Sequence, residues 1–173
     1  YDNEGYMNTG TQRSSATPMG AITTTTPILT KEHSKKDFVR IMEAHDLPYL
    51  ATTSPAYPID LYEKFVKAKR IKGTRYMHIY SPCPPGWMFP AKDTVRMGQL
   101  AVETGIVVLF EIEDGKFRFT GRSKTMAERG KKQPIINYVG KQGRFRKMSI
   151  EQLNRLQAWV DSRWNDYLRK AEG

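Results

Sequence analysis

Oxygen-bearing and amide side chains are concentrated in the first ten residues of the chain. Asp2, Asn3 and Glu4 are closely followed by Asn8 and Thr9, in a stretch that is typical of a strand running out into a loop. Magnesium prefers octahedral oxygen ligation and commonly takes one or two ligands from the protein, with phosphate oxygens and water completing the shell. The stretch therefore indicates a metal–phosphate site. Asn and Gly are also common turn formers, so a purely structural turn is the alternative.

The single cysteine, Cys83, is the second candidate for chemistry. A lone free cysteine is commonly a buried structural thiol. The surrounding stretch Ser81–Pro90 is dense in proline and glycine and must be a constrained loop, which favours a functional thiol. The three histidines show no metal-ligand spacing: His33, His45 and His78. The tryptophans are interpreted as core or interface anchors: Trp87, Trp159 and Trp164.

Four stretches resemble the β subunits of pyruvate synthase and related 2-oxoacid:ferredoxin oxidoreductases. The longest is YDNEGYMNTGTQRSSATPMGAITTTTP (residues 1–27); the others are YSPCPPGW (80–87), LAVETG (100–105) and KQGRF (141–145). The resemblance covers nearly the whole chain and is to the carboxy-terminal part of such a subunit. In the family, the metal–diphosphate motif opens well upstream with Gly-Asp-Gly, which is absent here. We therefore expect that tripeptide in sequence preceding Tyr1.

The resemblance implies roles for five residues of the first loop. The Asn3 side chain and the Gly5 carbonyl would bind Mg²⁺, which bridges the diphosphate of thiamine diphosphate. Tyr6, Asn8 and Thr9 would line the cofactor. The residue matching Asn8 lies beside the thiazolium ring, where an amide orients substrate or stabilises charge on the adduct. Asn8 is therefore the candidate catalytic residue.

The resemblance also implies that Cys83 is the fourth ligand of a 4Fe-4S cluster. One thiolate cannot hold such a cluster, so three further cysteines are expected upstream. The implied activity is oxidative decarboxylation of a 2-oxoacid, typically pyruvate, with coenzyme A, giving acyl-CoA, CO₂ and reduced ferredoxin. The implied partners are the other subunits of the complex and an acidic ferredoxin.

Three alternatives to this activity remain open at the level of the sequence. A sibling enzyme would act on phenylglyoxylate, oxalate or a branched-chain 2-oxoacid. A basic nucleic-acid-binding module would explain the positive charge, and a non-catalytic scaffold subunit is the third alternative. Intact cofactor motifs disfavour the scaffold, and no nucleic-acid motif accompanies the basic residues.

The elements that position these residues follow a layered α/β pattern. Helices are predicted from Ser34 to before Pro48, from Pro58 to before Gly73, over Asp93–Thr104 and from Ser149. Strands are predicted over Tyr49–Thr53, Arg75–Tyr80, Ile106–Glu113 and Lys116–Thr120, the last two forming a hairpin around Asp114-Gly115. Residues 1–30 are expected to form a long ordered loop.

The predicted architecture is a mostly parallel sheet flanked by helices, with a carboxy-terminal hairpin and long helix. The resemblance implies that this is a thiamine-diphosphate-binding fold. Residues 1–120 are expected to be the carboxy-terminal part of the cofactor domain. Residues 121–173 would form a helical extension, introduced by a basic linker or excursion over Gly121–Lys132.

Composition excludes several classes of protein. With 39% hydrophobic and 27% charged residues, the 173-residue chain is that of a soluble globular domain. No apolar run approaches the roughly 18 residues of a membrane helix, and the first residues do not resemble a signal peptide, so a cytoplasmic protein is expected. The net charge of +10 is concentrated in Lys64–Arg75, Arg118–Lys132 and Lys141–Lys147. We expect this charge to face partner subunits and ferredoxin rather than nucleic acid.

Overall fold

The computed structural model describes residues 1–173 and contains one four-stranded sheet. The strands are β1 (Tyr49–Thr53), β2 (Arg75–Ile79), β3 (Phe110–Glu113) and β4 (Lys116–Phe119). They lie in the order β2-β1-β3-β4, with β1 parallel to β2 and antiparallel to β3. Every residue of β1 is buried, as expected for a central strand covered on both faces.

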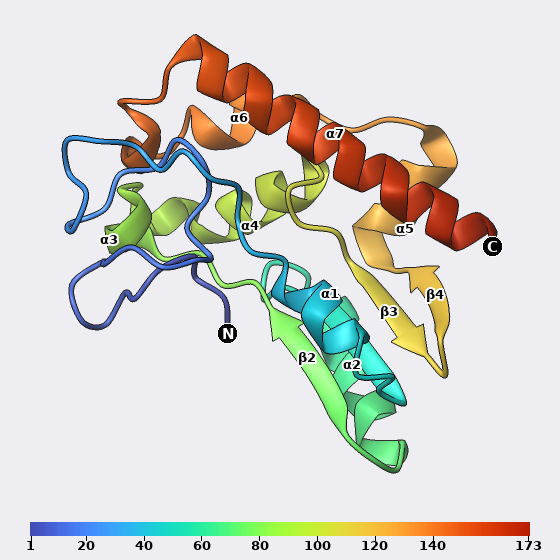
Figure 1. The fold of residues 1–173 in the computed structure, drawn as a ribbon. Helices are drawn as coiled ribbons and strands as arrows, with labels where there is room; N and C mark the ends of the chain where they lie inside the picture. The colour runs from blue at the N-terminus through green and yellow to red at the C-terminus, as the bar shows by residue number, and fades with distance from the viewer.

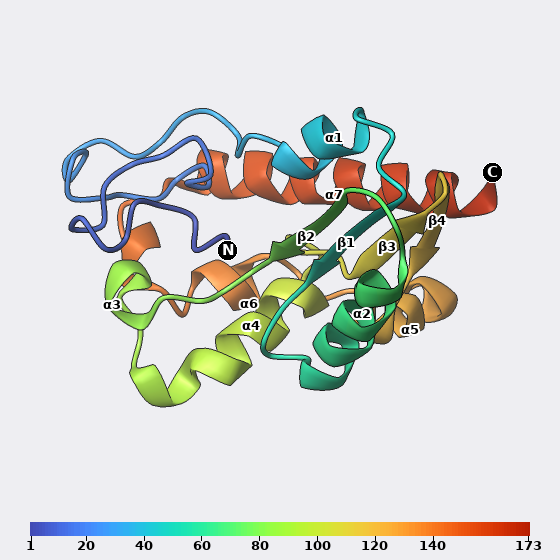
Figure 2. The same cartoon turned by 90° about the horizontal axis from the view of Figure 1, so that it is seen from below.

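Helices cover both faces of the sheet. The longer ones are α1 (Phe38–Glu43), α2 (Pro58–Arg70), α4 (Thr94–Glu103), α5 (Gly121–Arg129) and α7 (Ile150–Glu172). Seen from below, α1 and α7 lie on one side of the sheet, and α2, α4 and α5 lie on the other (Figure 2). None of these helices carries an apolar stretch that is long enough to cross a bilayer.

Short helical turns gather beside the first loop, away from the sheet (Figure 1). They are α3 (Pro84–Trp87), α6 (Ile136–Val139) and the 3₁₀ turns Ala91–Asp93 and Gly143–Phe145. Residues 1–30 contain no helix or extended strand, which confirms the predicted loop. The loop, the short turns and the beginning of α7 together form the end of the molecule that carries three of the four matched sequence stretches, while LAVETG lies at the end of α4.

Two apolar clusters make up most of the core. The larger packs α4 and α7 against the short turns around the fully buried Trp87 and Tyr138. The second packs the hairpin and β1 against α5 and α7, through Phe110, Met126 and Trp164. Because α7 contributes to both clusters, it joins the loop-rich end of the molecule to the sheet.

Local sequence signals account for two of the predicted elements. Ser149 caps α7 with a reciprocal capping box to Gln152, and Leu156, Val160 and Trp164 are buried along its inner face. Asp114 and Gly115 both have positive φ (48° and 76°), as a two-residue hairpin turn requires. The α/β fold with flanking helices, hairpin and long carboxy-terminal helix is therefore confirmed.

The sheet itself is mixed, however, rather than mostly parallel. Only the β1–β2 pair is parallel, whereas β3 runs antiparallel to both of its neighbours. The parallel pair is joined by the crossover helix α2. After α4 the chain enters β3 in the opposite direction, and the tight hairpin then forces β4 to reverse again.

Two helical boundaries also differ from the prediction. The first helix begins at Phe38 rather than at Ser34, because the Asp37 side chain accepts the hydrogen bond from the Arg40 N–H and acts as its cap. The expected linker over Gly121–Lys132 is mostly the helix α5, held in place by the buried side chains of Ser123 and Met126. Its polar composition reflects a solvated outer face.

Candidate functional site

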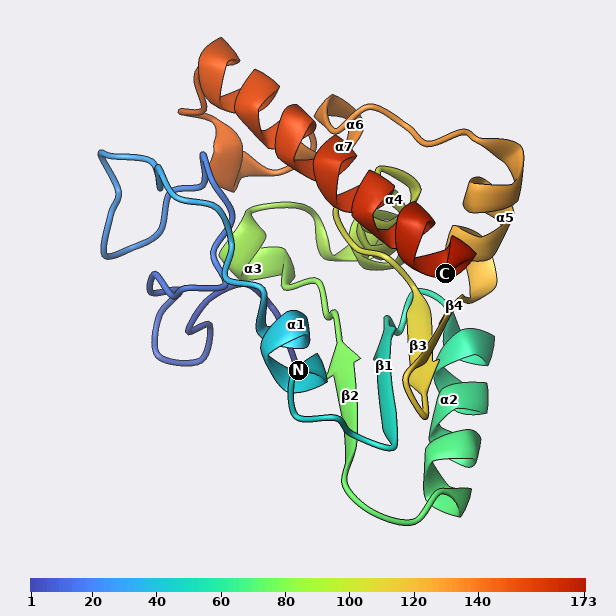
Figure 3. The ribbon, with the colours of Figure 1, turned by 45° about the vertical axis from the view of Figure 1, so that its right-hand side comes forward.

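The turn that contains Asn3 lies at the carboxyl end of β2. The Asp2 N–H donates to the Ile79 carbonyl at 2.8 Å, and the Ser81 N–H donates to the Asp2 carbonyl at 2.9 Å. The first residues therefore run beside the end of β2 like a neighbouring parallel strand (Figure 3). Open α/β sheets bind their ligands beyond the carboxyl ends of their strands.

Within this turn, the Asn3 side chain and the Gly5 carbonyl are the oxygen-bearing groups left available. The Glu4 N–H donates to the Asp2 carboxylate at 2.9 Å, and the Glu4 carbonyl accepts from the Thr17 hydroxyl at 2.9 Å. The Asn3 side chain and the Gly5 carbonyl form no hydrogen bond with the protein, and both line an open pocket of about 420 Å³.

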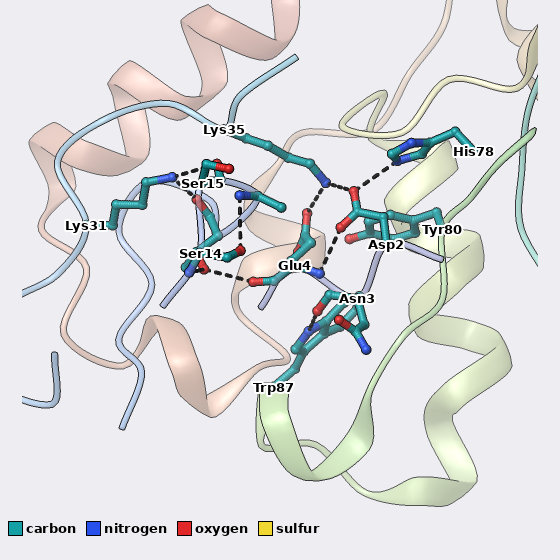
Figure 4. A network of polar contacts seen from close by, with 12 residues as sticks. Asp2, Asn3, Glu4, Ser14, Ser15, Lys31, Lys35, His78, Tyr80 and Trp87 are labelled. Carbon is teal, nitrogen blue, oxygen red and sulfur yellow. Dashed lines mark hydrogen bonds and ion pairs between the residues drawn. The ribbon is translucent and has the colours of Figure 1, made fainter. Parts of the chain in front are cut away.

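An ionic network lies behind the turn, and Figure 4 shows the part of it formed by Lys35, Asp2 and Glu4. Lys35 pairs with both Asp2 and Glu4, while Nη2 of Arg144 donates to the Glu4 carboxylate at 2.5 Å. Glu4 and Arg144 are 2% exposed or less, so their pair is shielded from solvent. Glu4 also has a left-handed backbone (φ 64°), a conformation that the surrounding contacts must hold.

A second chain of hydrogen bonds reaches the same network from β2. His78 Nε2 lies 3.0 Å from Asp2 Oδ2, and the Tyr76 hydroxyl lies 2.9 Å from His78 Nδ1. His78 therefore has polar partners on both ring nitrogens. Tyr76, His78 and Lys35 all line the pocket that holds Asn3.

The network is ionised and internally balanced. Burial opposes ionisation of Asp2, but the neighbouring Lys35 and His78 outweigh it and hold the pKa of Asp2 well below its usual range. Burial likewise opposes protonation of Lys35, yet Glu4 and Asp2 raise its pKa. Because two carboxylates face two cations, the network leaves little uncompensated charge, and we interpret it as a support for the turn.

Of the other residues that the resemblance assigns to the cofactor, Tyr6 lies at the same pocket and Asn8 and Thr9 do not. Tyr6 lines the pocket with Asn3 and Gly5, and its side chain is 61% exposed. Asn8 and Thr9 are exposed on the following turn and do not line this pocket. The structure thus brings Asn3, Gly5 and Tyr6 together, while the role of Asn8 stays a prediction.

Cys83 lies on the turn that packs against this loop. Its side chain is half-buried, and its Sγ has no hydrogen-bond partner. The indole Nε1 of Trp87, four residues later, donates to the Asn3 carbonyl at 2.8 Å. The stretch that contains Cys83 and the stretch that contains Asn3 are therefore in direct contact.

The residues present fit the groups that the sequence implies to different degrees. An amide oxygen and a carbonyl oxygen, both available at one pocket wall, suit Mg²⁺ bound mainly by phosphate and water. Lys36, an exposed residue that also lines the pocket, adds positive charge that suits a diphosphate. Cys83 offers one available thiol, and no group of three or more potential metal-ligating side chains (His, Cys, Asp or Glu) gathers in this chain. The chain thus suits one ligand of a cluster, not the whole set.

Sequence reasoning missed the support of the turn. Lys35, Trp87 and Arg144 were not assigned to the site, although Trp87 and Arg144 stand in the matched stretches YSPCPPGW and KQGRF. Their shared presence in matched stretches is the signal that was available. That the two side chains meet at Glu4 and Asn3 depends on tertiary structure and could not be read from spacing.

Comparison with known proteins supplies the context for this site. Pyruvate synthase subunit PorB of Methanothermobacter thermautotrophicus is 48% identical over 166 residues, or 94% of this chain and 56% of that protein. Ketoisovalerate oxidoreductase subunit VorB of Pyrococcus abyssi is 42% identical over 177 positions, or 99% of this chain and 55% of that protein. These similarities, which extend over nearly the whole chain, confirm the resemblance to pyruvate synthase and related subunits. The chain spans about half the length of the curated relatives that it matches.

The comparisons with solved structures and with protein-family models give weaker similarities or none. A solved 2-oxoglutarate:ferredoxin oxidoreductase from Magnetococcus marinus, with 2-oxoglutarate, coenzyme A and succinyl-CoA bound, matches 55% of this chain and 31% of its own chain. That match has 27% identity and a TM-score of 0.47. No protein-family model matches the chain.

Proposed function

We propose that this chain, a homologue of the PorB and VorB subunits, carries part of the thiamine diphosphate site of a 2-oxoacid:ferredoxin oxidoreductase. The observation that carries the proposal is the turn at the end of β2. There the Asn3 side chain and the Gly5 carbonyl are available at one pocket, while their neighbours are held by the protein. These two oxygens would bind Mg²⁺, and Mg²⁺ would hold the cofactor's diphosphate.

The chain's own residues would bind and orient the reacting groups. Thiamine diphosphate, when bound, supplies the carbon nucleophile and the electron sink for decarboxylation. Asn3 and Gly5 fix its diphosphate end, Tyr6 and Thr9 line it, and Asn8 presents an amide to the reacting centre. Cys83 completes the ligands of a 4Fe-4S cluster, which provides the one-electron exit that ferredoxin requires.

Pyruvate, with coenzyme A, is the substrate that we propose first. The similarity to PorB, named as a pyruvate synthase subunit, is the observation that favours it. The similarity to VorB, named as a ketoisovalerate oxidoreductase subunit, supports a branched-chain 2-oxoacid as the second candidate. Turnover of the complete complex with each 2-oxoacid, compared as kcat/KM, distinguishes the two.

The replacement Asn3→Ala tests the metal role. In the complete subunit, loss of the amide oxygen should weaken Mg²⁺ binding in the presence of thiamine diphosphate by about tenfold or more, corresponding to about 1.4 kcal/mol or more. The measurement is calorimetric titration of Mg²⁺ into protein with the cofactor present. Asn137→Ala is the matched control, because Asn137 is exposed on α6 and its amide contacts only Gln133. Normal Mg²⁺ dependence and cofactor affinity in Asn3→Ala would reject the assignment.

A further inference from the structure

A buried tryptophan from another loop holds the backbone of Asn3. Trp87 is 0% exposed, and its Nε1 donates to the Asn3 carbonyl. The Asn3 N–H and side chain have no partner in the protein, so this bond is the one hydrogen bond that Asn3 makes with the rest of the chain. Rotation of the peptide that follows Asn3 is therefore resisted by Trp87.

Arg144 lies over the ring of Trp87. The guanidinium carbon lies 4.1 Å from the indole centroid, within the range of a cation–π contact. The same guanidinium donates to the carboxylate of Glu4, the next residue after Asn3. One planar group thus fixes Glu4 by an ionic hydrogen bond and supports the Asn3 carbonyl through Trp87.

Stability alone does not explain this arrangement. A fully buried ion pair is a weak source of net stability, because desolvation of both charges offsets their attraction. Nη1 of Arg144 is moreover buried without any hydrogen-bond partner, which destabilises the fold. The geometry that the pair imposes on the turn is the better explanation for a costly group at this position.

We propose that Trp87 is a positioning residue that aims the Asn3 side chain at the pocket, and that Arg144 fixes Trp87 and Glu4 in that arrangement. The inference rests on the proposed role of Asn3 in binding Mg²⁺. It extends the cofactor site to two residues, in α3 and in the Gly143–Phe145 turn, that touch neither metal nor cofactor. Each acts through Asn3.

The replacement Trp87→Phe isolates the indole N–H, because an aromatic ring remains beneath Arg144. In the complete subunit, Mg²⁺ affinity in the presence of thiamine diphosphate should fall by about tenfold, the order expected for one lost hydrogen bond. The melting temperature of the cofactor-free protein should change by no more than a few degrees. Trp159→Phe is the matched control: Trp159 lies on α7, its indole N–H has no protein partner, and Mg²⁺ affinity should not change.

A double variant separates positioning from a general loss of packing. If Trp87 acts through Asn3, adding Trp87→Phe to Asn3→Ala should not weaken Mg²⁺ binding further, so the two effects are not additive. Arg144→Lys, which keeps the charge beside Glu4 but loses the planar stack, should weaken Mg²⁺ binding in the same direction as Trp87→Phe.

Two outcomes would overturn the positioning role. They are unchanged Mg²⁺ affinity in Trp87→Phe, whether or not the melting temperature falls, and fully additive effects in the double variant. Failure of the unaltered protein to bind Mg²⁺ with thiamine diphosphate is a different result. It would overturn the proposed function itself, and the positioning role with it.

Discussion

Two glycines and a methionine determine how the turn of Cys83 meets the turn of Asn3. A side chain at Gly86 would collide with the Met7 sulfur and would stand 3.2 Å from Cys83 Sγ. A side chain at Gly5 would stand 2.9 Å from the Met7 terminal methyl group. Met7 therefore fills the space between the turns, and the glycines leave room for it. The proposed metal ligands and the proposed cluster ligand consequently lie on adjoining turns.

The replacement Cys83→Ala tests whether Cys83 is a ligand of the proposed 4Fe-4S cluster or a structural thiol. As a ligand, Cys83 is needed for the cluster, so its loss should deplete iron and abolish ferredoxin reduction while leaving thiamine diphosphate binding largely intact. As a structural thiol, its loss should cost only packing, on the order of 1 kcal/mol, with iron content unchanged. Iron analysis and the visible spectrum of the purified complex measure the difference.

Met7→Leu provides the control for the Cys83 variant. It changes the packing beside the same turn without removing a thiol, so iron content should stay near the unaltered level. Full iron occupancy and normal turnover in Cys83→Ala would reject the ligand assignment.

The helix α2 exposes apolar side chains to solvent and buries an ion pair on its inner face. Its apolar residues Ile59, Tyr62 and Phe65 are 70%, 68% and 47% exposed. The inner face instead buries Asp60 and Lys64 as an ion pair, with N–O distances of 2.7 and 2.9 Å. Lys64 also donates to the Thr52 carbonyl and the Thr120 hydroxyl, so its ammonium is fully satisfied. The outer face is the kind of surface that a partner covers.

Variants of the two faces of α2 should have opposite consequences. Lys64→Met leaves the Asp60 carboxylate buried and unpaired, which should lower the free energy of unfolding by about 3–5 kcal/mol. Tyr62→Asp changes an exposed position and should alter stability by no more than about 0.5 kcal/mol. It places a charge on the outer apolar face, however, and should reduce co-purification of the other subunits. Denaturant unfolding and pull-down of the complex measure the two effects.

A control variant on α2 shows whether any exposed substitution on this helix affects stability or assembly. Glu63→Gln, an exposed change on the same helix, should leave both stability and assembly unchanged. Intact assembly in Tyr62→Asp would show that the partner subunits do not cover this face.

Elements specified by neighbouring residues could be predicted from the sequence, and those specified by distant residues could not. The hairpin at Asp114-Gly115 and the helix capped by Ser149 have local signals and were predicted correctly. The first helix begins at Phe38 rather than at Ser34, with Asp37 as its cap, and Asp37 also pairs with Arg163 of α7, far along the chain. In the candidate site, Asn3 and Gly5 could be proposed as metal ligands from the resemblance of residues 1–27. The support of Glu4 by Arg144 could not, because it depends on a contact between residues 140 positions apart.

At the scale of the whole molecule, the basic residues are not one class. Lys64 and Arg144, from two of the three basic segments, are internal and paired. By contrast, Lys69, Arg70 and Lys72 at the end of α2 are exposed and form no ion pair. Only cations of this second kind act on a molecule approaching from solution. Of the residues behind the net charge of +10, the exposed cations are therefore the ones that would attract an acidic electron carrier, whereas the buried cations serve the fold.

Salt should slow electron transfer to ferredoxin if the exposed cations guide its approach. Attraction between opposite charges raises encounter rates, and the Debye length shortens to about 10 Å at 0.1 M salt, so the association rate should fall as ionic strength rises. We expect kcat/KM for an acidic ferredoxin to fall by about tenfold or more between low salt and about 0.5 M, within the range that steering contributes to on-rates. An uncharged one-electron acceptor is the control, because its reduction should be nearly independent of salt. Ferredoxin reduction that stays flat across the same range would remove the acidic carrier from the proposal, while leaving the cofactor site untouched.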